Sequence, residues 1–207
     1  MRVLGVIAVM VVATLIAPGC TKQPADGRSG STKSGNTPSG EIGLADTQSG
    51  DARSGQTQST DPSGVQVYTN LGHAHTTAKV RYEPVPPVGG DHNPALLNCG
   101  IYDKPVPAEN AVHSLEHGAV WITYQPALPQ PEISRLRELV RGHGHLILSP
   151  YPDLSAPVVA SGWGVQIKLE GADDPRLPRF ISKYEGGPQA REPGAPCTGG
   201  IGTPIEH

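Results

Sequence analysis

The distribution of apolar residues divides the 207-residue chain into three parts. An apolar run covers residues 3–17, and a polar segment with almost no residue to bury follows from Thr21 to about Gly64. From residue 65 onward, apolar positions recur with the periods of strands and helices. The sequence therefore predicts one folded domain over residues 65–207, a length that suits a single ordinary domain.

Strand and helix patterns are mixed within this domain. Two amphipathic helices are predicted at 131–141 and 175–184, because each has apolar residues on one face and charged residues opposite. Five segments are β-branched or alternating, as strands are: 65–69, 79–82, 119–124, 145–149 and 164–169. We therefore expect an α+β domain with a mixed or antiparallel sheet and two amphipathic helices.

A segment dense in proline and glycine, YEPVPPVGGDHNP, occupies residues 82–94. Proline has no backbone N–H to donate, so this segment forms neither a helix nor a central strand. Ordered loops of this length in a compact domain often carry function. We expect this loop to present His92, which lies near its end.

The first twenty residues have the pattern of a bacterial export signal. Arg2 precedes the apolar run, which is too short to indicate a transmembrane helix. The sequence Ala-Pro-Gly-Cys resembles a lipobox, although Ala17 stands where leucine is usual. We expect residues 1–19 to be a signal peptide and Cys20 to carry lipid, and the alternative is a plain secretory signal with Cys20 as an ordinary thiol.

Export with a lipid anchor predicts a location at the cell envelope, facing the periplasm or the cell exterior. Residues 20–64 then form the lipidated cysteine and a linker rich in Gly, Ser and Thr, whose composition cannot repay the entropy of ordering. We expect a disordered tether that gives the domain reach from the membrane. Thr21 in place of aspartate favours the outer membrane in a double-membrane bacterium.

Charge and cysteine content narrow the class of protein. The formal net charge of −3 becomes −4 without Arg2, so no basic surplus indicates nucleic-acid binding.

Besides Cys20, the chain has Cys99 and Cys197, and an exported protein with two thiols most often pairs them. Closing so long a loop removes about 4–5 kcal/mol of unfolded-state entropy in a simple chain model. The alternative is two free buried thiols.

Seven of the eight histidines lie in short clusters. Clustered neutral imidazoles suit zinc, copper or nickel. The clusters are GHAH with His73 and His75, GGDH with His92, HSLEH with His113 and His117, and GHGH with His143 and His145. The last pair follows a predicted helix, where surface histidines complement the helix C-terminus. His207 is the final residue, and we expect it to be disordered.

The HSLEH sequence predicts a short helix, because Pro107 suits its start and Gly118 its end. On this helix His113, Glu116 and His117 share one face. The order H-x-x-E-H is that of inverzincin peptidases, in which the histidines bind zinc and the glutamate acts as general base. Such enzymes need a third ligand from a second helix, and this domain is small for that fold. A zinc-dependent hydrolase with Glu116 as base is therefore an alternative hypothesis.

A series of motifs covers nearly the whole folded domain. The run VRYEPVPPVGGDHNPALLNCGIYDKPVPAENAVHSLEHGAVWITYQPALP is followed by LSPYPDL and SGWG and closed by EPGAPCTGG. This series resembles the bacterial family catalogued as domain of unknown function 3105, whose members look like exported or membrane-anchored proteins. The cysteines also fit a subgroup of that family, which supports pairing Cys99 with Cys197. The resemblance implies membership of the family and says almost nothing about activity.

The family pattern matches His92, His113 and His117, and it matches His75 as the histidine just before VRY. The resemblance thus implies that these four imidazoles converge on a metal ion. Glu116 is then a further ligand or an acceptor for an imidazole N–H.

The expected ion is copper before zinc. The chain after residue 19 has no methionine, and imidazole-rich sites suit copper(II) or zinc, of which copper binds more tightly. A tethered domain with this site would buffer, deliver or oxidise copper, and no organic cofactor is indicated. In the alternative without metal, His113 and His117 are hydrogen-bonded within the domain, which is then a structural or interaction module.

The tether hypothesis predicts that deleting residues 21–60 leaves the thermal unfolding midpoint of the soluble domain unchanged, because a disordered segment contributes no packing. Differential scanning calorimetry of the two chain lengths measures this midpoint. A large decrease would contradict the hypothesis.

Overall fold

The computed structural model describes residues 61–207. The predicted signal peptide, Cys20 and nearly all of the predicted linker lie outside the described residues. Near the start of the described part, Asp61 contacts Tyr184 and Lys183, and Pro62 is buried. The chain therefore packs against the domain from residue 61.

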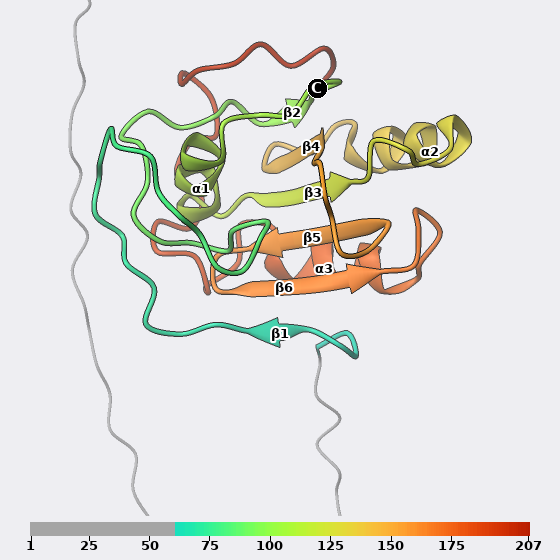
Figure 1. Ribbon diagram of the computed structural model, residues 1–207, viewed down its shortest axis with the longest axis horizontal. Helices are drawn as coiled ribbons and strands as arrows, with labels where there is room; N and C mark the ends of the chain where they lie inside the picture. The colour runs from blue at the N-terminus through green and yellow to red at the C-terminus, as the bar shows by residue number, and fades with distance from the viewer. Residues whose placement is uncertain (1–60) are drawn as a thin grey trace, which may run out of the picture. The chain divides into compact units, whose positions relative to one another are not determined.

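The described residues form an α+β fold, as the sequence predicts (Figure 1). A six-stranded sheet has the strand order β1-β6-β5-β3-β4-β2. Strands β2 and β3 run parallel to β4, whereas the β3–β5, β5–β6 and β6–β1 pairs are antiparallel, so the sheet is mixed. In chain order the elements are β1 (Gln66–Val67), β2 (Gly100–Ile101), α1 (Ala108–Glu116), β3 (Val120–Tyr124), α2 (Gln130–Val140), β4 (Leu146–Pro150), β5 (Val158–Gly162), β6 (Val165–Leu169) and α3 (Arg176–Tyr184).

Side-chain alternation along the strands gives the sheet two apolar faces. In β3, Val120 and Ile122 belong to the core beneath α2 and α3, whereas Trp121 belongs to the core on the side of α1. The predicted amphipathic helices are confirmed as α2 and α3, and their buried residues face the first of these cores. Helix α1 packs with Trp121 in the second core, and this places the histidine helix on the opposite face from α2 and α3.

Two predicted strands differ from the structure, and two observed strands, β2 and β5, were not predicted. Segment 79–82 is not a strand, because it runs beside α1, where the amide of Val80 donates to the carboxylate of Glu109 rather than to a neighbouring strand. Strand β5 was not expected, since its sequence VVASG is buried along its whole length and shows no alternation. Strand β2 has only two residues, and the predicted strand at 65–69 contracts to the two residues of β1.

No helix among residues 61–207 is both long enough and apolar enough to cross a membrane.

Cys99 and Cys197 form a disulfide, with their Cα atoms 5.4 Å apart. Both residues are buried in the core on the α1 side, and the amide of Cys99 also donates to the carbonyl of Cys197 at 2.8 Å. The bond joins the segment before β2 to the C-terminal segment that follows α3. It therefore holds the C-terminal segment against the face of the sheet that α1 covers.

We expect replacement of both cysteines by alanine to lower the free energy of unfolding by about 2–5 kcal/mol, because the bond closes a loop between residues 98 apart in sequence. Urea unfolding of the double variant and of the wild type, each with and without dithiothreitol, measures the change. Reduction should destabilise only the wild type. Equal stability of the oxidised wild type and the variant would show that the bond adds nothing.

Candidate metal centre

Helix α1 supplies two donor side chains from one short segment. It begins after Pro107, whose backbone is extended, and its last turn leads into Gly118 with φ +100°. A Cβ at position 118 would lie 3.0 Å from the Cα of Gly186, so glycine is needed both for this turn and for the close approach of the C-terminal segment. The apolar side of α1 is fully buried, and His113 and Glu116, three residues apart, stand together on its other side.

Two further histidines reach α1: His92 from the proline-rich loop at 82–94, and His75 from the segment before it. His75 and His92 form an isolated parallel bridge, in which the amide of His92 donates to Ala74 at 3.0 Å and the amide of Thr76 donates to His92 at 2.7 Å. The amide of Asn93 donates to the carbonyl of Glu109 in the first turn of α1. Segments far apart in sequence are thereby fixed side by side by backbone hydrogen bonds.

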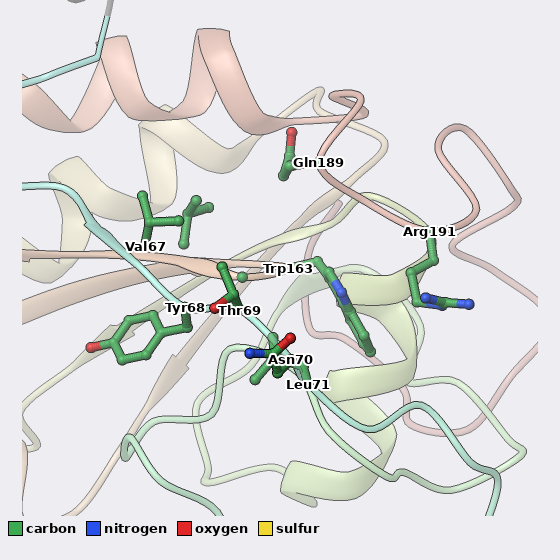
Figure 2. Close-up of a pocket in the computed structure, with 10 residues that line it drawn as sticks. Val67, Tyr68, Thr69, Asn70, Leu71, Trp163, Gln189 and Arg191 are labelled. Carbon is green, nitrogen blue, oxygen red and sulfur yellow. The ribbon is translucent and has the colours of Figure 1, made fainter.

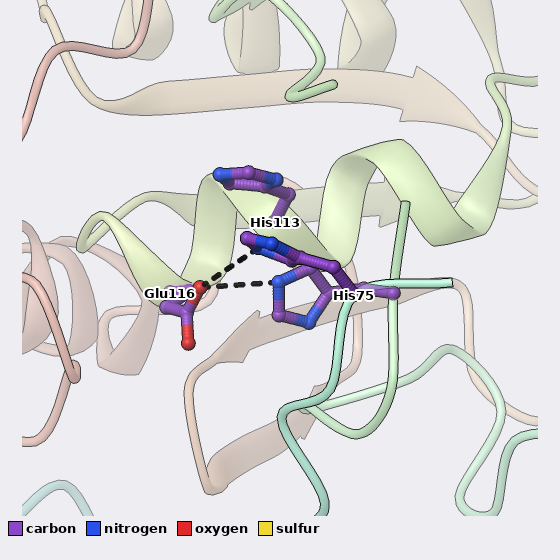
Figure 3. Close-up of side chains that lie close together, drawn as sticks. His75, His113 and Glu116 are labelled. Carbon is purple, nitrogen blue, oxygen red and sulfur yellow. Dashed lines mark ion pairs between the residues drawn. The ribbon is translucent and has the colours of Figure 1, made fainter. Parts of the chain in front are cut away.

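Four donor groups converge at this junction: His75, His92, His113 and Glu116. Each offers one ligand atom, and these atoms all lie within 4.8 Å of one another. The three imidazole ring centroids are each 5.0 Å from the other two. Figure 3 shows His75 and His113 beside Glu116, whose Oε2 lies 3.1 Å from Nε2 of His92 and 4.0 Å from Nε2 of His75.

Backbone carbonyls fix which nitrogen of each buried ring carries the proton. Nδ1 of His92 lies 2.8 Å from the oxygen of Gly90, and Nδ1 of His113 lies 2.7 Å from the oxygen of Asn93. Because a carbonyl only accepts, each Nδ1 must donate, and each neutral ring then has a lone pair on Nε2. This is the arrangement that holds metal-binding histidines in orientation in proteins.

The Nε2 atom of His92 is fully buried and has no hydrogen-bond partner within the described part of the chain. Oε2 of Glu116 is close to it, yet both atoms are acceptors when the ring is neutral, so their proximity is not a hydrogen bond. A cation between the two atoms would satisfy both. The geometry of the four donors is therefore one that could hold a metal ion.

Burial and the neighbouring imidazoles make His113 a poor base. Desolvation is the larger cause that lowers the pKa of His113, and the His117, His92 and His75 rings add to it. The ring is consequently neutral at pH 7, the form in which imidazole binds a metal.

The site has one exposed side. The side chain of His75 is 53% exposed, whereas those of His92 and Glu116 are 0% and 7% exposed. On another side the indole of Trp163 packs edge-on against His92, with ring centroids 6.0 Å apart. Nε of Arg191 lies 3.4 Å from Oε1 of Glu116, so the guanidinium balances the carboxylate charge.

An open pocket of about 390 Å³ adjoins the site, and Figure 2 shows Trp163 and Arg191 together at one end of it. Its other walls come from Val67 at the end of β1 and the four residues after it, from Gly164 and Val165 at the start of β6, and from Gln189. Trp163 lines this pocket and packs against His92, whereas the solvent-facing donor of the site is His75.

His117 does not belong to the four-donor group, although the sequence places it on the same helix face. Its Nδ1 donates to the carbonyl of Pro196 at 2.7 Å, and its Nε2 lies 3.1 Å from Nε2 of His113. Oε2 of Glu192 is 3.5 Å from Nε2 of His117. Sequence reasoning did not select Glu192, because it is one acid in a polar loop and no spacing links it to α1.

The remaining clustered histidines lie elsewhere. Nδ1 of His143 pairs with the carboxylate of Glu185 at 2.7 Å, and Nε2 of His145 is 2.9 Å from the carbonyl oxygen of Ala195. His73 is exposed next to the His75 segment and is not a member of the group.

The lowered pKa of His113 predicts how stability depends on pH in the metal-free domain. Below about pH 6.5 the unfolded chain binds a proton at this position more readily than the folded chain does, so stability decreases as pH falls from that value. We expect the His113→Asn variant, which keeps a donor for the carbonyl of Asn93, to lose less stability between pH 7 and pH 5. Urea midpoints in the presence of a chelator measure both slopes, and equal slopes would contradict the assignment.

Comparison with known proteins places the chain in a family without assigning an activity. No curated protein and no solved structure matches it. The family model described as "Protein of unknown function (DUF3105)" matches residues 73–199, more than half of the chain. That segment includes the four donors, His117, Glu192 and both cysteines of the disulfide. The chain therefore belongs to the DUF3105 family of proteins of unknown function.

Proposed function

We propose that this protein binds one divalent transition-metal ion through His75, His92, His113 and Glu116, with copper(II) preferred to zinc. The observation that carries the proposal is the fully buried Nε2 of His92, which has no hydrogen-bond partner among residues 61–207 and lies 3.1 Å from the Glu116 carboxylate. A buried polar atom without a partner costs about 1–3 kcal/mol. A bound ion removes this cost and engages the lone pairs of the three rings together with the carboxylate.

The donor set supports copper(II) or zinc. Three imidazoles and one carboxylate contain no soft sulfur ligand, and both cysteines among the described residues are in the disulfide. For equal ligands copper(II) binds more tightly than zinc, which takes the same four donors in tetrahedral geometry. The Glu116 carboxylate offsets part of the charge of a divalent ion, which lowers the cost of holding the ion in a largely buried site.

The proposed setting is the cell envelope. An export signal ending at Cys20, a lipid on that cysteine and a polar linker would leave the domain facing the periplasm or the exterior. The disulfide supports an oxidising compartment. In this setting the domain would hold copper and pass it on, with the membrane as its attachment and no nucleic acid as partner.

The zinc hydrolase hypothesis has less support than metal storage. A general base must be free to take a proton from metal-bound water. Oε2 of Glu116 lies among the nitrogen donors, and its Oε1 faces Arg191, so the position of this carboxylate favours a ligand role. His117, the second histidine of the peptidase motif, is outside the donor group.

Metal titration of the chain from Thr21 onward, purified without an affinity tag, tests the proposal. We expect one Cu²⁺ per chain by elemental analysis, with nitrogen coupling in the electron paramagnetic resonance spectrum. His92→Ala should weaken binding by more than the roughly 10–100-fold typical of changes outside the ligand set. The matched control is His143→Ala, which removes an exposed histidine of another cluster.

Circular dichroism and the metal-free urea midpoint establish that the His92→Ala variant is folded. Less than a tenth of an equivalent of copper or zinc on the wild type would overturn the proposal and leave a structural module. Equal losses of affinity in His92→Ala and His143→Ala would also overturn it.

A further inference from the structure

A second set of donors adjoins the four-donor group and shares His113 with it. We infer that His113, His117 and Glu192 form an outer position for the same Cu²⁺ or Zn²⁺ ion, through which the ion reaches and leaves the four-donor site. This inference rests on the proposed function and specifies how the ion is transferred.

The Nε2 atoms of His113 and His117 are placed as ligands of one ion would be. Nδ1 of His113 donates to Asn93, and Nδ1 of His117 donates to Pro196, both at 2.7 Å. When both rings are neutral, each has its lone pair on Nε2, and the two Nε2 atoms lie 3.1 Å apart. Nitrogens bound to one ion at about 2.0–2.1 Å are separated by roughly 2.9–3.4 Å for bond angles of 90–109°, so a single ion fits between them.

Glu192 supplies the third donor and the connection to solvent. Its Oε2 lies 3.5 Å from Nε2 of His117, and its side chain is 61% exposed, whereas that of His117 is 11% exposed. The loop is fixed on the end of α1, because the amide of Glu192 donates to Glu116 at 2.9 Å and the amide of Gly194 donates to His117 at 3.2 Å. Exposure thus decreases along one row of donors, from Glu192 through His117 to His113.

The shared ligand determines the manner of transfer. Nε2 of His113 has one lone pair, so the inner and outer positions cannot be filled together, and one ion binds per chain. The ion moves when His117 and Glu192 exchange with His92, His75 and Glu116 while His113 stays bound. Each position offers the divalent ion one carboxylate, Glu116 in the inner set and Glu192 in the outer, so the ion has an anionic ligand on both sides of the move.

A transfer position changes rates without changing affinity, since it lies between the bound and free states of one equilibrium. We expect His117→Asn and Glu192→Gln each to slow both uptake and release of Cu²⁺ roughly tenfold, with the dissociation constant unchanged. Asparagine at position 117 retains a donor for the carbonyl of Pro196, and glutamine at position 192 keeps the shape of an exposed side chain. The control is Glu185→Gln, an acid that pairs with His143 instead.

Stopped-flow mixing measures both rates on the chain from Thr21 onward: Cu²⁺ uptake by the metal-free protein, and release from the loaded protein to an excess of chromophoric chelator. Unchanged rates in both variants would overturn the inference while the proposed function stands. A loss of affinity in His117→Asn comparable with that in His92→Ala would overturn it as well, because His117 would then be a ligand of the resident ion. A wild type that binds no copper or zinc would overturn both proposals.

The His92→Ala variant gives a direct observation of the outer position. With the inner set incomplete, Cu²⁺ should occupy His113, His117 and Glu192 with weaker affinity and a different electron paramagnetic resonance spectrum. Adding Glu192→Gln should abolish this residual binding. Residual binding that survives the second substitution would contradict the assignment of Glu192.

Discussion

The hydrogen bonds from imidazole Nδ1 atoms to backbone carbonyls are the interactions on which the candidate site depends. Gly90, Asn93 and Pro196 each present a carbonyl to one ring, so the protonated nitrogen of His92, His113 and His117 is fixed by main chain. A side-chain acceptor can rotate away, whereas these carbonyls belong to segments docked on α1. The fold therefore selects the tautomer, and with it the direction of three lone pairs.

The same arrangement makes the metal-free site unfavourable. Nε2 of His92 lies beside a carboxylate oxygen, and Nε2 of His113 lies beside Nε2 of His117. When the rings are neutral, acceptor atoms therefore meet acceptor atoms in a largely buried space. Such conflicts persist in a folded protein only where the surrounding structure outweighs them, and they are concentrated at functional sites. Here the surrounding structure is the core between α1 and the sheet, together with the disulfide that belongs to it.

The disulfide links the stability of the domain to the outer part of the site. Cys197 directly follows Pro196, whose carbonyl orients His117, and Glu192 lies five residues earlier in the same segment. This segment has little regular structure, and it is placed by its bond to Cys99 and by hydrogen bonds to the end of α1. A covalent bond compensates for the small apolar area that a loop rich in Gly and Pro can bury.

Local pattern in the sequence was sufficient for much of the fold. Periodicity located α2 and α3, and the density of proline and glycine identified 82–94 as a loop with His92 near its end. The three- and four-residue spacings placed His113, Glu116 and His117 on one face of α1, because helix geometry is a local property. Local pattern failed at β5, where burial on both faces removes the alternation, and at 79–82, where a side chain of α1 takes the place of a strand partner.

Only the tertiary structure decided which donors meet. The bridge between His75 and His92, the separation of His117 from the four-donor group and the approach of Glu192 all depend on contacts between segments distant in sequence. No periodicity records such contacts, since they arise from the packing of whole elements. The sequence by itself determined the residue types that can bind a metal and the helix that carries two of the four donors. Packing determined the direction of their lone pairs, because the carbonyls that fix the rings come from other segments.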